Sequence, residues 1–108
     1  MFGQAPIKRS LLPDAMDVYV PDGSGGFSGP ARISRVRFDE EQSASDDAHR
    51  SADAGAGTVY IDAVMSGGAF EIPAGSRVEI GGSSYYVTKV RRRCAKWGRV
   101  HHWEVEVS

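Results

Sequence analysis

Cysteine is almost absent from this chain of 108 residues, in which Cys94 is the only one. An internal disulfide needs two thiols, so the sequence excludes the small secreted proteins that disulfides hold together. Long apolar runs are also missing, since no stretch approaches the roughly 20 residues that span a bilayer as a helix. Residues 1–10 carry Lys8 and Arg9 without the apolar segment of a signal peptide. We therefore expect a protein that is made in the cytoplasm and has no membrane partner.

An excess of charge of one sign is lacking as well. Thirteen Lys and Arg residues against fourteen Asp and Glu residues leave a net charge of -1. A surface built throughout to hold phosphates would be strongly basic, so any contact with nucleic acid must be local. The length is that of one domain, which excludes an enzyme with separate cofactor and substrate lobes.

The apolar pattern is that of short strands. Alternating apolar residues, or runs rich in β-branched and aromatic residues, predict strands at 16–20, 31–38, 58–64, 76–80, 84–90 and 100–107. The alternation changes phase between Ile33 and Val36, which indicates a β-bulge near Ser34 or Arg35. The apolar residues of 40–51 are all alanine, so no helix there has a face to pack. We predict an all-β fold, a small antiparallel β-barrel or sandwich of five to six strands.

Within this fold we expect an N-terminal arm at 1–13 and a single domain at 14–108 with a long loop at 40–57. The arm contains Pro6 and Pro13, so we expect it to be extended and to be ordered only by a neighbouring protein. Its predicted docking residues are Lys8, Arg9, Leu11 and Leu12. The predicted core contains Val18, Val20, Ile61, Val78, Val87, Trp103 and Val105.

The near-neutral net charge conceals two charged poles. The long loop is strongly acidic, and its candidate contact residues are Asp39, Glu40, Glu41, Asp46, Asp47 and Asp53. Residues 89–99 form a basic pole without an acid, with the candidate contact residues Lys89, Arg91, Arg92, Arg93, Lys96 and Arg99. We interpret 91–99 as a basic turn. Cations beside Trp97 are also what a small barrel uses to bind single-stranded nucleic acid, so that function stands as an alternative.

Residues for catalysis or metal binding do not converge. His101 and His102 are adjacent on a predicted strand, so we expect their side chains to point to opposite faces, one beside Trp103 and one at the surface. No Gly-x-Ser-x-Gly motif surrounds a serine nucleophile. Glu104 and Glu106 share one strand face and should meet solvent or a partner. We expect neither an enzyme nor a cofactor or metal site.

Several segments, taken in order, resemble the phage minor capsid protein family. The last strand reads His-His-Trp-Glu-Val-Glu-Val at 101–107 and is similar to the closing strand of that family. Its Val-Arg strand is resembled by residues 33–38 and its Ile-Asp-Ala strand by residues 59–66. The hairpin of the family is resembled by residues 75–78 together with residues 85–90. The acidic loop and the triple arginine depart from the family pattern.

The resemblance implies a structural virion protein of a tailed bacteriophage, similar to the head-closure or stopper proteins of the head-tail connector. Such proteins are β-barrels that assemble as a homo-oligomeric ring at the head-tail junction. Portal and adaptor proteins lie above the ring, tail-completion or tail-terminator proteins lie below it, and packaged DNA passes through the channel. In a ring, the acidic loop could meet the basic pole of a neighbouring subunit, or it could point into the channel and repel DNA phosphates.

Overall fold

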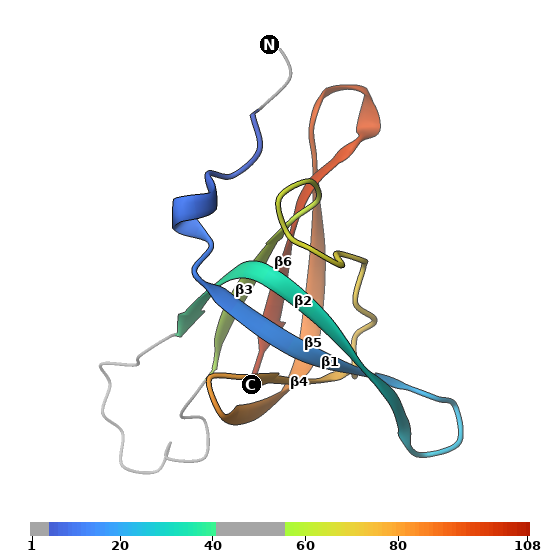
Figure 1. Ribbon diagram of the computed structural model, residues 1–108. Coiled ribbons are helices and arrows are strands. Elements are labelled where there is room, and N and C mark those ends of the chain that lie inside the picture. The colour runs from blue at the N-terminus through green and yellow to red at the C-terminus, as the bar shows by residue number, and fades with distance from the viewer. Residues whose placement is uncertain (1–4, 41–55) are drawn as a thin grey trace, which may run out of the picture.

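Six antiparallel strands form a closed barrel in the computed structural model, which describes residues 5–40 and 56–108 (Figure 1). The strands are β1 (Asp14–Pro21), β2 (Phe27–Glu40), β3 (Gly57–Asp62), β4 (Arg77–Ile80), β5 (Ser83–Cys94) and β6 (Val100–Val107). Two short 3-10 helices, η1 (Arg9–Leu11) and η3 (Lys96–Gly98), complete the regular structure of the described residues. The order around the barrel is β1-β2-β3-β6-β5-β4, and β4 pairs back onto β1. The all-β prediction is confirmed, with a barrel rather than a sandwich.

A β-bulge bends β2 where the apolar pattern changes phase. Asp14 lies opposite Val36 and Ala15 lies opposite Ser34, so Arg35 is an extra residue on β2, and its φ is 58°. The extra residue allows both Ile33 and Val36 to face the interior, where each is fully buried. The predicted bulge is therefore confirmed, and it lets one long strand pair with β1 and then with β3.

Four strands end at positions other than those predicted, and β1 and β2 run one and two residues further, to Pro21 and Glu40. β3 ends at Asp62 instead of continuing to Val64, because the Asp62 carboxylate accepts hydrogen bonds from the backbone N–H groups of Val64 and Met65 at 2.9 and 2.8 Å. These bonds close a turn and leave the Val64 side chain exposed. β5 continues past residue 90 to Cys94 and pairs with β6 along this extension. The interpretation of Arg91, Arg92 and Arg93 as part of a turn was therefore wrong, because they lie on a strand.

The barrel interior holds the predicted core. Val18, Ile61, Val78, Val87, Trp103 and Val105 are buried, and Val20 is partly buried against the same cluster. The cluster also contains Met16, Val36, Val59 and, from the connection between β3 and β4, Ile72. Alternation along each strand directs these side chains inward, so the core is one continuous apolar cluster.

The segment before β1 packs on the barrel from residue 5 onward. The Ile7 N–H donates a 2.9 Å hydrogen bond to Asp62 Oδ1, and Leu12 is only 3% exposed. Leu11 remains exposed, and η1 (Arg9–Leu11) turns the chain between these contacts. The expectation of an extended arm that only a neighbour orders was therefore wrong for residues 5–13. Leu12 is taken up by the barrel itself, whereas Lys8, Arg9 and Leu11 stay at the surface.

Residues 5–40 and 56–108 include no helix with the length and apolar character needed to cross a membrane.

Candidate functional site

The basic stretch of β5 faces acidic side chains of the same subunit. Arg91 forms an ion pair with Glu106, and Arg93 Nε lies 3.3 Å from Glu104 Oε2. Both acids lie on β6, which runs beside β5, so the ladder brings the opposite charges together. Glu104 and Glu106 were expected to meet solvent or a partner, but each meets an arginine of its own chain. Arg91 and Arg93 are thus partly neutralised before any partner binds.

Arg92 points to the other face and is held by an acid that the sequence did not single out. Its Nε and Nη2 atoms donate to the two carboxylate oxygens of Glu71 at 2.7 and 2.8 Å. The Trp103 indole N–H donates to the same carboxylate at 3.0 Å. Hydrogen bonds from Arg92 and then from Trp103 lower the pKa of Glu71 to about 2, and the bond with Glu71 raises the pKa of Arg92. Glu71 lies in a connection between strands, where strand alternation carries no information about facing partners.

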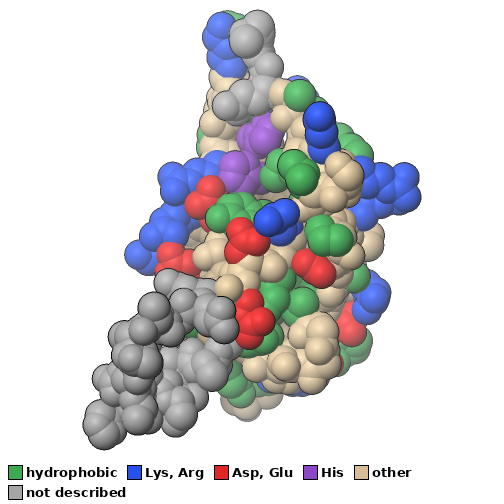
Figure 2. Space-filling view, turned by 90° about the vertical axis from the view of Figure 1, so that its left-hand side faces the viewer, with side chains coloured by type: hydrophobic (Ala, Val, Ile, Leu, Met, Phe, Trp, Pro, Cys, Tyr) green, Lys and Arg blue, Asp and Glu red, His purple; other side chains and the backbone are tan. Residues whose placement is uncertain are grey.

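Three cations of the basic pole, those of residues 91–93, are therefore paired with acids of the same chain. Within the described residues, no ion pair involves Lys89 or Arg99. Lys96 places its Nζ atom 5.9 Å from the centre of the Trp97 ring. In Figure 2, Lys and Arg side chains alternate with Asp and Glu side chains over the face shown instead of forming one basic patch. A nucleic-acid groove needs several unpaired cations along a track, so this arrangement gives the alternative function little support.

The two neighbouring histidines contact each other, contrary to the expectation that they point to opposite faces. His101 Nδ1 and His102 Nδ1 are 2.9 Å apart, and His102 Nε2 lies 3.0 Å from Glu104 Oε2. The reason is another bulge: Arg93 pairs with His102 while Cys94 pairs with Val100, so His101 is an extra residue on β6. A bulge breaks the alternation of faces, which brings the two rings to the same side.

His101 also links the segment before β1 to β6, since its Nε2 atom lies 2.7 Å from the Ala5 carbonyl oxygen. This oxygen can only accept, so His101 Nε2 carries the proton. Among residues 5–40 and 56–108, no group of His, Cys, Asp and Glu side chains is arranged to hold a metal ion. His101 therefore holds the N-terminal segment through Ala5, while His102 contacts His101 and Glu104.

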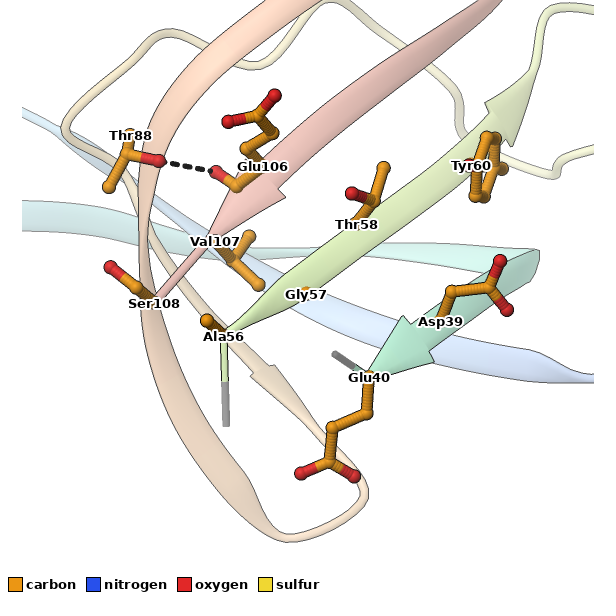
Figure 3. A pocket seen from close by; sticks show the side chains of 10 residues that line it. All are labelled: Asp39, Glu40, Ala56, Gly57, Thr58, Tyr60, Thr88, Glu106, Val107 and Ser108. Atoms are coloured by element: carbon orange, nitrogen blue, oxygen red, sulfur yellow. Dashed lines mark hydrogen bonds between the residues drawn. The ribbon is translucent and has the colours of Figure 1, made fainter. Parts of the chain in front are cut away.

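The acidic pole is described only at its two ends. Asp39 accepts a 2.9 Å bond from Arg37 Nε, and together with Glu40 it lines an open pocket of about 650 Å³. Figure 3 shows this pocket between the end of β2 and the start of β3, where Glu106 and the C-terminal Ser108 also line it. The predicted contact residues Glu41, Asp46, Asp47 and Asp53 lie outside the described residues.

Comparison with known proteins identifies the family. A family model described as "Minor capsid protein" matches residues 22–107, which include β2 and every later strand. No curated protein matches the chain, and no solved structure matches it either. A protein of this family is a structural component of a phage virion, a class distinct from enzymes. With a family match over most of its length, the chain belongs to the phage minor capsid proteins.

Proposed function

We propose that this chain is a head-closure subunit of a tailed bacteriophage. In this proposal several copies form a ring at the head-tail junction, below the portal and adaptor proteins. The ring retains packaged DNA and offers the surface to which the tail attaches. Membership of the minor capsid family supports a virion role, and the family match is the observation that carries the proposal. The more specific assignment rests on what the resemblance of the strands to that family implies, namely a protein similar to head-closure proteins.

The closed barrel also supports this role. Every strand has a partner on both sides, so the subunit is complete as a folded unit before it meets another copy. Contacts in a ring would then be made by side chains and by the connections between strands. Such contacts are heterologous, because one face of a subunit meets a different face of the next copy.

Deletion of the gene, with complementation in trans as the control, tests the proposal. Electron microscopy of the lysate should show free tails beside heads that have lost their DNA, and complementation should restore complete virions. Normal virions without the protein would contradict a head-closure role. A salt-dependent titration with oligonucleotides tests the alternative, because a dedicated nucleic-acid binder loses affinity steeply as salt rises.

A further inference from the structure

The tip of the β5–β6 hairpin presents the most exposed large apolar side chain of the described residues. Trp97 is 88% exposed, compared with 72% for Val64 and 53% for Tyr86. Figure 1 shows that the β5–β6 hairpin projects beyond the barrel body. Single exposed apolar residues are common on monomeric proteins, and exposure alone does not define a binding site.

The backbone at this position gives a second, independent observation. Trp97 has a φ of 71° and a ψ of 16°, which is the left-handed region that bulky residues seldom adopt. The next residue, Gly98, has a φ of 77°. The tip thus requires two successive left-handed residues, and glycine would satisfy both at lower conformational cost. A tryptophan kept in such a conformation indicates a role for its side chain.

The tip is held by a well-braced stem. The Ala95 N–H donates to the Arg99 carbonyl at 2.6 Å, and the Gly98 N–H donates to the Ala95 carbonyl at 3.2 Å. Below these bonds, the pairing of Arg93 with Glu104 connects the two strands. A side chain presented on a rigid support loses little conformational entropy when it binds, and tryptophan is prominent among residues that dominate interface energies.

The chemistry around the indole indicates what it would contact. Lys96 and Arg99 flank Trp97, and residues 95–100 contain no acid. A single ring on a convex tip does not provide the successive stacking surfaces or the groove that single-stranded nucleic acid requires. A protein pocket with an apolar floor and carboxylates at its rim would match both the indole and the flanking cations.

The position of the tip relative to the N-terminal segment indicates which neighbour it meets. Ala5 contacts His101, only four residues after Trp97, and Figure 1 shows this segment and the hairpin at one end of the molecule and the C-terminus at the other. The N-terminal segment was predicted to dock on a neighbouring protein, and in the proposed head-closure role we take the end that carries it as the end that faces the head. We propose that Trp97 anchors the subunit in an apolar pocket, rimmed by Asp or Glu side chains, on the head-side neighbour protein; this inference rests on the proposed function.

Complementation of the gene deletion with variant chains tests the anchor. Trp97→Ala is compared with Trp97→Phe, which keeps an aromatic ring, and with Tyr86→Ala, which removes an exposed aromatic side chain near the other end of β5. The readouts are the amount of this chain on purified heads and the titre of infectious phage. We expect Trp97→Ala to reduce both on the order of tenfold or more, as for a residue that dominates an interface. Trp97→Phe should retain most of both, and Tyr86→Ala should match the wild type.

Each variant is also purified, and its circular dichroism and thermal unfolding are compared with those of the wild type. The anchor is contradicted if Trp97→Ala is folded and remains on heads at the wild-type level, or if Tyr86→Ala is lost to the same extent. It is also contradicted if Trp97→Ala changes only the self-association of the purified chain, or only its binding to an oligonucleotide. Normal virions from the deletion phage would defeat the head-closure role itself, which separates that failure from failure of the anchor.

Cys94 allows the contact to be mapped directly. It is exposed, lies three residues from Trp97 and is the only cysteine in the chain, so a benzophenone maleimide attaches at one place. The labelled chain is added to heads purified from the deletion phage and irradiated. A cross-link to a head protein is expected, and its yield should fall with Trp97→Ala. A product of twice the mass of this chain as the main species would overturn the proposal.

Discussion

Trp97 combines an unfavourable backbone conformation with a side chain that buries little surface in the subunit. Trp97→Gly should therefore raise the free energy of unfolding by about 1 kcal/mol, because glycine reaches the left-handed region without a Cβ clash. The greater flexibility of glycine in the unfolded chain offsets part of this gain. Urea denaturation of the purified protein measures the change.

Trp97→Ala is the matched control for that substitution. Alanine keeps the Cβ atom and the strained φ, so its free energy of unfolding should stay close to that of the wild type. A Trp97→Gly protein that is less stable than Trp97→Ala would mean that the indole stabilises the isolated hairpin. The strain would then have no link to binding.

Glu71 gives the stability of the barrel a defined response to acid. Its pKa lies at about 2 in the folded protein, compared with 4.5 for a free glutamate. A carboxylate with a depressed folded-state pKa adds stability above its unfolded pKa and loses that contribution as the pH falls through the folded pKa. The free energy of unfolding of the wild type should therefore exceed that of Glu71→Gln by a constant amount above about pH 5. This difference should shrink as the pH falls from about 4.5 to about 2.

Thermal unfolding across this pH range measures the effect. Because the pair between Glu71 and Arg92 is well exposed to solvent, we expect a small difference that weakens at high salt. Glu79→Gln is the comparison. Glu79 also accepts a hydrogen bond from an arginine, Arg77, but among the described residues no indole N–H donates to it as that of Trp103 does to Glu71. A Glu71→Gln protein whose loss of stability is the same at pH 3 as at pH 7 would contradict the assignment.

At the scale of elements, one buried carboxylate fixes the end of β3. Asp62 is fully buried and accepts hydrogen bonds from the backbone N–H groups of Ile7, Val64 and Met65. Asp62→Asn removes the charge and replaces one acceptor oxygen with an NH2 group that faces donors. We expect the free energy of unfolding to fall by about 2 kcal/mol, the scale of hydrogen bonds to a charged group.

Hydrogen exchange at the three amides separates the local effect from global destabilisation, since these amides should exchange faster than those of the barrel strands. Asp17→Asn serves as the control, because the exposed ion pair of Asp17 with Arg32 should contribute less than about 1 kcal/mol. Equal losses for the two variants would show that the bonds at Asp62 are not what stabilises the turn.

Two of the bulges show how far the sequence predicts the elements. The bulge at Arg35 was predictable because apolar residues on both sides of it change phase. The bulge at His101 was not predictable in this way, because the apolar alternation of β6 runs from Trp103 to Val107 and no alternation before the bulge shows a change of phase. The charge pairs were missed for a related reason: Arg91 and Glu106 meet only once β5 is known to extend beside β6. Alternation reports which face is buried, but pairing register depends on the whole fold.

At the scale of the whole molecule, charge pairing within the subunit bears on how copies would meet. Arg91, Arg92 and Arg93 are already paired with acids of their own chain, so few cations remain to attract the acidic loop of a neighbour. Replacing Asp46, Asp47 and Asp53 together by asparagine should therefore leave ring assembly within about twofold of the wild type. Retention of DNA by the completed head should change instead, because the loop would lose its repulsion of phosphates.

Assembly is measured by sedimentation of the purified chain, and DNA retention by the ratio of full to empty heads. The control replaces Asp14, Asp17 and Asp22 by asparagine. These residues lie on or next to β1, so the control removes the same number of negative charges outside the loop. Loss of the ring with the loop variant but not with the control would instead assign the loop to contacts between subunits.

The return of β4 to β1 has a consequence for the assembly of free copies. Each strand has two neighbours in the closed order, so newly made copies find few backbone positions through which to polymerise. The exceptions are the outer edges of β2 and β5 toward their hairpin tips, where each strand is paired on one side only. In the proposed head-closure role the virion uses the protein at one place, whereas newly made copies are free in the infected cell. Closure of the barrel limits the association of those copies mainly to contacts between side chains and loops, so that free copies would form the proposed ring instead of open-ended sheets.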